Sequence, residues 1–374
     1  MKTAVVEKEN VGGRCLNEAC IPAKAILRVA EVMQEVEHAR NFGISVNGSS
    51  FDYTGAAKHR DKVVKTLTGG VGMLFEKNKI DLIEGFGAVT DDANVRIGGQ
   101  FDGTEIETDR VVLATGSVAK PILGLEFGGR ILDTAGMWLL NEQPSRLCVI
   151  GAGASGTEIA SALGRLGTEV LLLEVLDQIL PLEDEEIAKA CAREIRKQNV
   201  RIETGAKVEG AEASDSGVSV SWDGNSEEFD YLVIAAGRGP DVEGLGLDEA
   251  GIERDERGFI KVDGRLRTSR EGVWAIGDMV PGPALAHKAS DEGIIAVEDA
   301  AGNEVHEIDY TYIPAVTFCY PQVASFGLTE KAAREAGYDV VIGKVPMGAV
   351  GAPTVYGDRA GLVKIVGDKK YGEI

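Results

Sequence analysis

Long apolar runs and positive charge are both scarce in this sequence of 374 residues. No stretch of about 18 uninterrupted apolar residues occurs, and glutamates stand within the first ten residues, where a secretory signal would have its apolar core. With 39 Lys and Arg against 60 Asp and Glu, the formal charge is -21, which disfavours binding to nucleic acid or to an anionic membrane. We therefore expect a cytoplasmic protein with neither kind of partner.

Cysteine and histidine are also few. The five cysteines are odd in number and spread over a long chain, which is not typical of a disulfide-stapled secreted domain. Cys148 in an apolar strand pattern, Cys191 in a helical one and Cys319 in a β-like run are each expected to be small core residues. Cys15 and Cys20 stand close together, and no second Cys or His pair lies at ligand spacing, so we expect no metal site.

Glycine, by contrast, is abundant. The 48 glycines, with 44% apolar and 26% charged residues, indicate a globular chain with many tight turns, as in nucleotide-binding α/β folds. The length predicts two or three compact domains. Apolar periodicity predicts strands at residues 3–7, 111–114, 147–150 and 170–173, helices at 22–40, 56–78, 187–198 and 287–302, and a β-rich segment from 313.

The strongest single signal is the segment 12–24, GGRCLNEACIPAK. The C-x4-C spacing of Cys15 and Cys20 covers about one helical turn, so a strand-to-helix bend can bring the two sulfurs within bonding reach. Cys20 lies near the start of a predicted helix, where the dipole and unpaired N–H groups favour a thiolate. The pattern favours a redox disulfide over a buried cysteine pair or half of a metal site.

A second motif, GAGASG, directly follows the strand at 147–150 and leads into a helix, and the next strand ends at Glu174. A lone G-x-G-x-x-G is weak, but strand, turn, helix, strand and terminal acid together are typical of a dinucleotide-binding unit. Its glycines let the backbone approach a pyrophosphate, while Glu174 can accept hydrogen bonds from a ribose 2′-hydroxyl. These glycines are Gly151, Gly153 and Gly156. Because a carboxylate would repel a 2′-phosphate, we expect NAD rather than NADP.

A third motif, AIGD at residues 275–278, is followed by PALAHK at 283–288. Taken alone, an acid after a glycine is as consistent with a helix cap or a turn as with a binding site.

Together and in this order, the three motifs resemble those of the flavoprotein disulfide reductases, and their residues are most similar to the dihydrolipoamide dehydrogenase branch. The resemblance runs the length of the chain and includes GRGP at 237–240, GLGL at 244–247, IPAV at 313–316 and GLTE at 327–330. It implies an α/β fold with two Rossmann-like nucleotide-binding domains, for FAD and NAD, and the start of an α+β interface domain. It also implies FAD-dependent oxidation of protein-bound dihydrolipoamide, with reduction of NAD through a Cys15–Cys20 disulfide.

The resemblance assigns roles to individual residues. Cys15 would be the interchange thiol that meets the substrate and Cys20 the thiol next to the flavin. Lys24 would lie near the flavin's reactive nitrogen and pair with Glu158, since a buried lysine needs a counter-charge. Further FAD contacts are implied for Glu7, Gly87, Asp278 and Ala286, and further cofactor contacts for Gly116, Val208 and Gly237. Glu7 could also be an ordinary strand end and Gly87 an ordinary turn glycine.

Two parts of the family pattern fall outside the sequence. The first G-x-G-x-x-G would precede residue 1, and a histidine followed by a glutamate, the base given to the partner subunit, would follow residue 374. His38, His59, His287 and His306 stand in no such motif. We therefore expect the chain as given to bind FAD weakly or not at all and to be incomplete for turnover. The family implies a homodimer, although most of the dimer-forming domain would follow residue 374, and a lipoyl domain of a 2-oxoacid dehydrogenase or glycine cleavage complex as partner.

Two other interpretations stay open. A mercuric- or glutathione-reductase-like flavoprotein shares the cysteine motif, although Glu174 and residues 275–288 favour the lipoamide branch. The other is a non-catalytic NAD-binding fragment. The domains that we predict are a first FAD-binding part at 1–120, an NAD-binding domain at 121–240, a second FAD-binding part at 241–312, and a truncated dimerisation or interface domain at 313–374.

Overall fold

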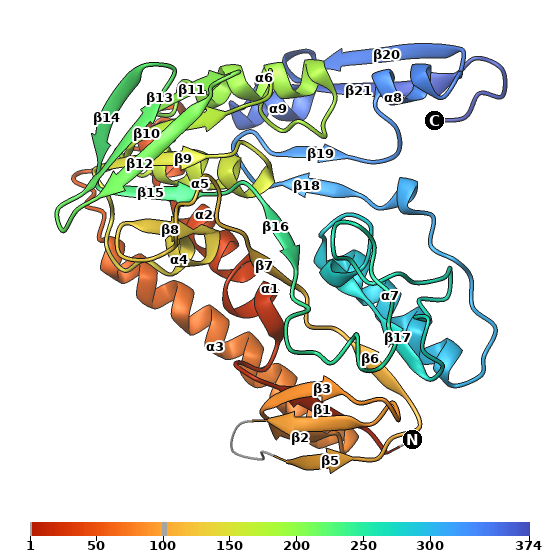
Figure 1. Cartoon of the computed structure of the whole chain (residues 1–374). Helices are drawn as coiled ribbons and strands as arrows, with labels where there is room; N and C mark the ends of the chain where they lie inside the picture. Colours follow the sequence, from red (N-terminus) through yellow and green to blue (C-terminus); the bar gives the residue numbers. More distant parts are fainter. Residues whose placement is uncertain (1, 99–102) are drawn as a thin grey trace. The chain divides into compact units, whose positions relative to one another are not determined.

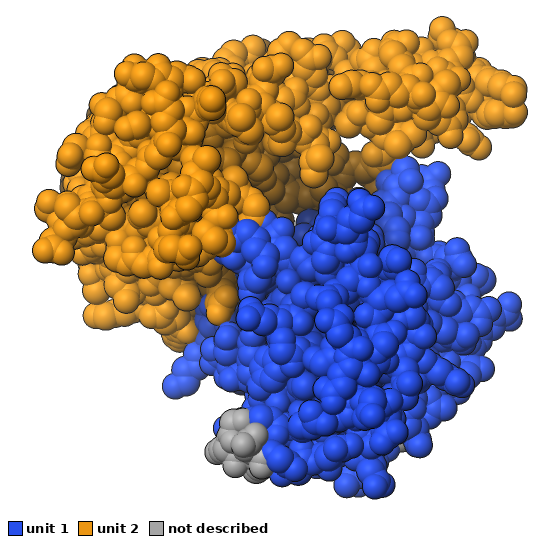
Figure 2. Space-filling view, in the orientation of Figure 1, with its two compact units in different colours: residues 1–17, 64–120, 238–313 blue, residues 18–63, 121–237, 314–374 orange. Residues whose placement is uncertain are grey.

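The structure is a computed structural model that describes residues 2–98 and 103–374. They form two compact units, each built from segments that are distant in the sequence (Figure 2). Unit 1 comprises Met1–Asn17, Val64–Lys120 and Arg238–Ile313, and unit 2 comprises Glu18–Val63, Pro121–Gly237 and Pro314–Ile374. The four domain segments predicted from the sequence divide the chain differently from these two units and stay a prediction.

Unit 2 contains a five-stranded, all-parallel sheet in the order β11-β10-β9-β15-β8 (Figure 1). The strands are β8 (Ile131–Asp133), β9 (Arg146–Ile150), β10 (Glu169–Glu174), β11 (Val200–Thr204) and β15 (Tyr231–Ile234). Their near-continuous apolar runs are what a parallel sheet covered on both faces requires. The strands predicted at 147–150 and 170–173 are confirmed.

Successive residues of these strands point to opposite faces of the sheet, and each face has its own cover. Leu147 and Val149 pack with the helices α4 (Thr134–Leu139), α5 (Ala154–Arg165) and α6 (Glu185–Ile195), while Cys148 and Ile150 pack with a second sheet. This second sheet is antiparallel, in the order β12 (Val208–Ala213), β13 (Val218–Trp222), β14 (Asn225–Phe229). Helix α6 ends three residues before the predicted end at 198.

Two more helices complete the helical face. In α2 (Cys20–His38), Ala23, Ile26 and Leu27 share one side of the helix and join the same core as α5, as the spacing i, i+3, i+4 dictates. A short 3-10 helix, Ala39–Phe42, continues α2, and α3 (Tyr53–Asn78) follows, with its residues up to Val63 in unit 2 and those from Val64 in unit 1. The predicted helices at 22–40 and 56–78 are therefore confirmed.

The rest of unit 2 is the predicted β-rich segment, with short helices added. It consists of the antiparallel pair β18 (Ala315–Thr317) and β19 (Val323–Ser325), α8 (Glu330–Glu335), the antiparallel pair β20 (Val340–Pro346) and β21 (Leu362–Asp368), a 3-10 turn (Met347–Ala349) and α9 (Gly351–Tyr356). Cys319 lies in the bend between β18 and β19 rather than in a strand. Cys148, Cys191 and Cys319 are free and buried, as expected.

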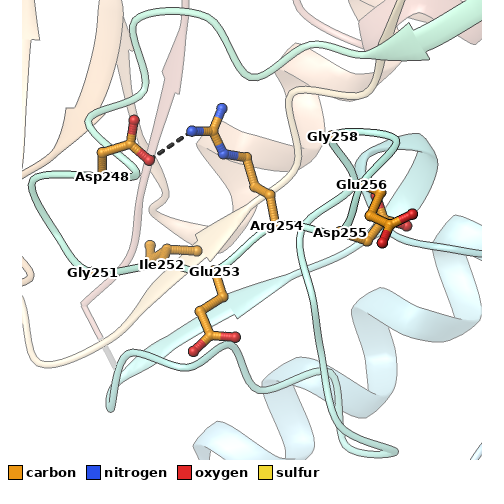
Figure 3. Close-up of a pocket in the computed structure, with 8 residues that line it drawn as sticks. All are labelled: Asp248, Gly251, Ile252, Glu253, Arg254, Asp255, Glu256 and Gly258. Carbon is orange, nitrogen blue, oxygen red and sulfur yellow. Dashed lines mark hydrogen bonds and ion pairs between the residues drawn. The ribbon is translucent and has the colours of Figure 1, made fainter.

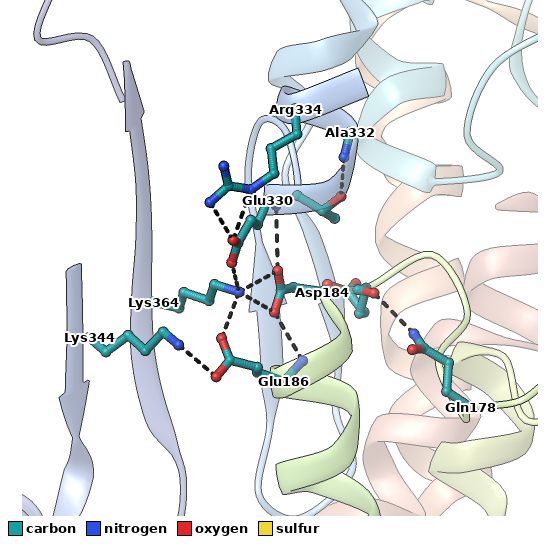
Figure 4. Close-up of polar contacts among 10 residues, drawn as sticks. Gln178, Asp184, Glu186, Glu330, Ala332, Arg334, Lys344 and Lys364 are labelled. Carbon is teal, nitrogen blue, oxygen red and sulfur yellow. Dashed lines mark hydrogen bonds and ion pairs between the residues drawn. The ribbon is translucent and has the colours of Figure 1, made fainter. Parts of the chain in front are cut away.

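Lys364 joins this segment to α6. Its side chain is 4% exposed, and its Nζ lies 2.8 Å from carboxylate oxygens of Asp184, Glu186 and Glu330 (Figure 4). Asp184 also caps α6 by accepting the N–H of Glu186 at 3.1 Å. One ammonium group thus compensates three carboxylates that come from two parts of the chain.

The strands of unit 1 form short pairs and one three-stranded sheet. They are β1 (Ala4–Glu7) with β2 (Asp81–Glu84), parallel; β3 (Phe86–Val89), β4 (Val95–Gly98) and β5 (Thr104–Ile106), antiparallel; β6 (Val111–Leu113) with β17 (Val273–Ala275), parallel; and β7 (Ser117–Ala119) with β16 (Arg238–Pro240), antiparallel. The helices are α1 (Gly13–Asn17), α7 (Ala286–Ala300) and the 3-10 turns η3 (Gly277–Met279) and η4 (Tyr310–Tyr312). The predicted strands at 3–7 and 111–114 and the helix at 287–302 are confirmed. Within the described residues, no helix has both the length and the apolar character needed to cross a bilayer.

We predict that Lys364→Met lowers the free energy of unfolding by about 2–3 kcal/mol, because it leaves three carboxylates without their shared cation. The loss is smaller than for a fully buried pair because these carboxylates keep some solvent contact. Lys344→Met is the matched control: its side chain is 45% exposed and pairs with Glu186 alone, so we expect a change below about 1 kcal/mol. Urea unfolding of the full chain measures both, and equal losses would contradict the assignment.

The same cluster predicts a pH dependence. The hydrogen bond from Lys364, which has the larger effect, and the one from Arg334 lower the pKa of Glu330 from 4.5 to about 2. A carboxylate whose folded-state pKa is lowered contributes stability above pH 4.5 and loses that contribution as the pH falls through about 2. The deficit of Glu330→Gln relative to the unmodified chain should therefore be constant above pH 5 and shrink steadily below about 4.5. Glu335→Gln, at a side chain that is 68% exposed, should show no deficit at any pH.

Candidate functional site

Cys15 and Cys20 are joined by a disulfide bond, as the C-x4-C spacing predicts. Cys15 lies in α1, and Cys20 is the first residue of α2. Before them, Gly12 and Gly13 have φ values of 101° and 64°, in a region that side chains disfavour and glycine occupies freely. The glycines of the motif thus form the sharp turn that starts α1.

One helical turn after Cys20, Lys24 forms an ion pair with Glu158 of α5. Its Nζ lies 3.0 Å from Oε1 and 3.1 Å from Oε2 of the carboxylate. The side chain of Glu158 is 6% exposed and that of Lys24 is 35% exposed, so the lysine alone keeps access to solvent. The predicted pairing is present in the structure.

Phe318 completes this pair and was not among the residues predicted from the sequence. Its backbone N–H donates a hydrogen bond of 2.8 Å to Oε1 of Glu158. Its ring centroid lies 4.5 Å from Nζ of Lys24, within the range of a cation–π contact. The only sequence signal was its place two residues after the IPAV segment.

The glycine turn at 151–156 requires glycine at two of its three glycine positions. Gly151 has a φ of 99°, and a Cβ on Gly156 would lie 1.9 Å from the carbonyl oxygen of Gly151, so neither position accepts a side chain. Gly153 is the N-cap of α5 and faces open space. With no side-chain cap and no acid in its first turn, the start of α5 offers its N–H groups to an anion. A dinucleotide's pyrophosphate fits this arrangement.

Glu174 at the end of β10 has a structural role that the sequence did not indicate. Its Oε2 accepts the N–H of Ala152 at 2.7 Å, and its Oε1 accepts the N–H of Leu176 at 2.9 Å. The carboxylate therefore ties the glycine turn to the strand end. Because a carboxylate offers about four acceptor positions, contact with a ribose hydroxyl stays compatible and stays a prediction. The same holds for cofactor contacts of Val208, at the start of β12, and of Gly237, which has a φ of 84°.

In unit 1, Ser117 connects two other predicted positions, Gly116 and Asp278. Asp278 lies in η3, and its Oδ2 accepts a 2.6 Å hydrogen bond from the hydroxyl of Ser117. Ser117 directly follows Gly116, whose φ is 78°, and its Oγ also accepts from Nε of Arg238 at 3.1 Å. Ala286 is the first residue of α7.

Glu7 and Gly87 lie at neighbouring strands of unit 1. Oε1 of Glu7 accepts the N–H of Glu9 at 2.8 Å. A Cβ on Gly87 would lie 3.2 Å from Cγ1 of Val6, which is tighter than ordinary packing. Close strand packing is thus one reason for this glycine, and the FAD contacts of both residues stay predictions.

Unit 1 also has a surface hollow that contains none of the predicted site residues (Figure 3). It is lined by Asp248, Gly251, Ile252, Glu253, Arg254, Asp255, Glu256 and Gly258. Its main interaction is the exposed 2.6 Å ion pair between Arg254 and Asp248, which contributes little stability. Across the described residues, no group of three or more His, Cys, Asp or Glu side chains is arranged to hold a metal ion.

Comparison with known families gives two matches that together cover nearly the whole chain. Residues 1–293 match the pyridine nucleotide-disulphide oxidoreductase model, and residues 313–374 match the dimerisation domain of the same family. Dihydrolipoyl dehydrogenase of Thermus scotoductus is 40% identical over 98% of this chain and 80% of its own length. The Bacillus subtilis enzyme of that name is 38% identical over 99% of the chain and 80% of its own length.

Two solved structures are similar to this chain in fold. The HOCl-induced flavoprotein disulfide reductase RclA of Escherichia coli is 29% identical, with a TM-score of 0.87 over 98% of this chain and 81% of its own. LpdA of Mycobacterium tuberculosis superposes with a TM-score of 0.91 at 24% identity, over 99% of this chain and 82% of its own. The α/β fold with FAD- and NAD-type Rossmann domains is therefore confirmed.

The glycine turn gives a prediction with an internal control. Gly156→Ala should lower the free energy of unfolding by more than about 3 kcal/mol, because its Cβ would overlap a backbone oxygen that cannot move alone. Gly153→Ala should change it by less than about 0.5 kcal/mol, because the site is open and its φ of -69° suits any residue. Thermal unfolding of the two variants makes the comparison. If both lost the same stability, the assigned close approach would be wrong.

Proposed function

Because the chain belongs to the pyridine nucleotide-disulphide oxidoreductase family, we propose that it oxidises protein-bound dihydrolipoamide to lipoamide and passes the electrons to NAD. The observation that carries the proposal is the Cys15–Cys20 disulfide, one helical turn before a lysine whose ammonium group pairs with a buried carboxylate. The dihydrolipoyl dehydrogenase relatives support the choice of substrate.

The disulfide step needs only this chain and a dithiol. One thiolate of dihydrolipoamide attacks Sγ of Cys15, the Cys15–Cys20 bond breaks, and Cys20 leaves as a thiolate. The second substrate thiolate then attacks the substrate sulfur of the mixed disulfide, which releases lipoamide and leaves Cys15 as a thiolate. Two electrons stay on the cysteine pair, and the two substrate protons go to a base or to solvent.

The family's cofactors are FAD and a pyridine nucleotide. When bound, FAD is the carrier that takes two electrons from the dithiol and delivers them to the nicotinamide. Lys24 places a positive charge one turn from Cys20, and Glu158 together with Phe318 fixes where that charge lies. With FAD bound, the ammonium of Lys24 would offer positive charge to the flavin, while the carboxylate of Glu158 keeps that ammonium in position.

NAD is the nucleotide that the site favours over NADP. The carboxylate of Glu174 lies at the strand end where the 2′ position of the ribose is expected, and negative charge there disfavours a 2′-phosphate. For the partners, we propose a lipoyl domain as the substrate carrier and a homodimer, which the match of residues 313–374 to a dimerisation domain supports. We further propose that the protein acts in the cytoplasm.

The proposal predicts which cysteine meets the substrate, without depending on bound flavin. In Cys20→Ser, the remaining Cys15 thiol should form a mixed disulfide with lipoamide, whereas Cys15→Ser should form at least tenfold less. Mass spectrometry of the intact chain after reaction with lipoamide measures the adduct. Cys20→Ser combined with Cys148→Ala is the control and should form the same adduct as Cys20→Ser, because Cys148 is fully buried and burial raises the pKa of its thiol. Adducts mainly in Cys15→Ser would reverse the two roles.

The choice of nucleotide is tested by binding. NADH should bind at least tenfold more tightly than NADPH, because Glu174 repels the additional phosphate. Fluorescence titration of the purified chain with each nucleotide, at fixed salt, gives the two dissociation constants. A preference for NADPH would favour a glutathione- or mercuric-reductase-like activity, whereas nucleotide binding without any dithiol exchange at Cys15 would favour a non-catalytic NAD-binding protein.

A further inference from the structure

Helix α7 of unit 1 contains an ion pair with no solvent contact. Lys288 and Glu292 are one turn apart, the Nζ–Oε1 distance is 3.0 Å, and both side chains are 0% exposed. Removing two charges from water costs free energy that their attraction only partly recovers, so such a pair is often no more stabilising than apolar residues of the same size. Stability alone therefore does not account for it.

Both members of the pair bind the same glycine. The N–H of Gly277 donates to Oε2 of Glu292 at 2.7 Å, and its carbonyl oxygen accepts from Nζ of Lys288 at 2.8 Å. Gly277 has a φ of 76°, the left-handed conformation that glycine alone adopts without cost. The ion pair thus holds both polar backbone groups of one residue in a turn that begins η3.

A third side chain fixes the carboxylate itself. The hydroxyl of Tyr310 donates to Oε1 of Glu292 at 2.6 Å. Burial, together with the neighbouring carboxylate, raises the pKa of Tyr310, so the hydroxyl keeps its proton and stays a donor. Glu292 therefore accepts from a lysine, a tyrosine and a backbone amide, each from a different position in the chain.

The residue after Gly277 is Asp278, one of the positions expected to contact the flavin nucleotide. It lies in a 3-10 turn of only three residues, which has little stability of its own. The hydrogen bond from Ser117 reaches the Asp278 side chain, but the direction of the backbone that carries it is set at Gly277. Lys288 and Glu292 hydrogen-bond to both polar groups of that backbone.

We propose that Lys288 and Glu292 are positioning residues, which clamp Gly277 so that Asp278 faces the ribityl and phosphate part of FAD. This rests on the proposed function only through the identity of the cofactor. Since the two charges compensate each other, the clamp adds no net charge beside the phosphates. The sequence signal was the Lys–Glu spacing of four residues that starts at the last residue of the PALAHK segment at 283–288.

The test uses the full chain with Lys288→Met and Glu292→Leu combined, because a single substitution would leave one buried charge unpaired. The melting temperature without FAD should stay within a few degrees of the unmodified chain. Hydrogen exchange at the Gly277 amide should become at least tenfold faster, and the dissociation constant for FAD should rise about tenfold, the usual effect of losing one or two hydrogen bonds. Mass-spectrometric exchange of peptides containing Gly277 and equilibrium dialysis with FAD give the two readouts.

Asp299→Asn is the matched control. Asp299 lies on the same helix in a second buried cluster, where Arg267 and Trp274 donate to it at 2.6 and 3.0 Å. This variant should leave Gly277 exchange and FAD affinity unchanged whatever it does to stability.

Two results would overturn the proposal: a double variant that melts far lower while its folded fraction binds FAD normally, or one in which Gly277 exchange does not change. The first would make the pair purely structural, and the second would show that it does not clamp the turn. If the double variant lost protection at Gly277 but bound FAD as tightly as the unmodified chain, the flavin role would fall and the clamp would stand. That outcome is distinct from failure of the dithiol chemistry, which is measured at Cys15 without FAD.

Discussion

The buried carboxylate of Glu158 is the constraint on which the candidate site depends. A charge with so little solvent contact must be compensated where it lies, and Glu158 is compensated by the ammonium of Lys24 and the amide of Phe318. These partners come from α2 and from the segment after β18, whereas Glu158 lies on the helix that follows the glycine turn. Three distant parts of the sequence are thereby held in fixed register by one side chain.

Lys24, Lys288 and Lys364 each compensate a buried or half-buried carboxylate, and the exposure of the three side chains separates their roles. Lys288 is 0% exposed and Lys364 is 4% exposed, so both are committed to partners within the protein. Lys24 keeps 35% of its side chain exposed and is the only one of the three that a bound cofactor or substrate can approach. The same ion-pair chemistry therefore holds a turn at Lys288, connects two segments at Lys364, and leaves Lys24 accessible to a reactant.

Residues that the sequence suggests as ligand contacts also have structural roles in this fold. Glu174 accepts two backbone amides before any ribose hydroxyl, and Gly87 is close-packed against Val6 whether or not an adenine lies nearby. These structural contacts also hold Glu174 and Gly87 at positions where a ligand could contact them. A motif residue can therefore be explained by packing and by binding at once, and only a measurement that separates stability from affinity distinguishes them.

The sequence by itself determined the local parts of this protein. The C-x4-C spacing indicated the disulfide, apolar periodicity located the strands and helices that were predicted, and the glycines at 151–156 indicated a turn between a strand and a helix, because each depends on neighbours within one or two turns of chain. Tertiary structure alone decided that Phe318 supports Glu158, that Ser117 bonds Asp278, and that Cys319 lies in a bend. It also decided that Lys288 and Glu292 both bind Gly277, although their helical spacing was visible beforehand. Such contacts join residues far apart in sequence, and their geometry depends on how whole elements pack, which no local period or motif encodes.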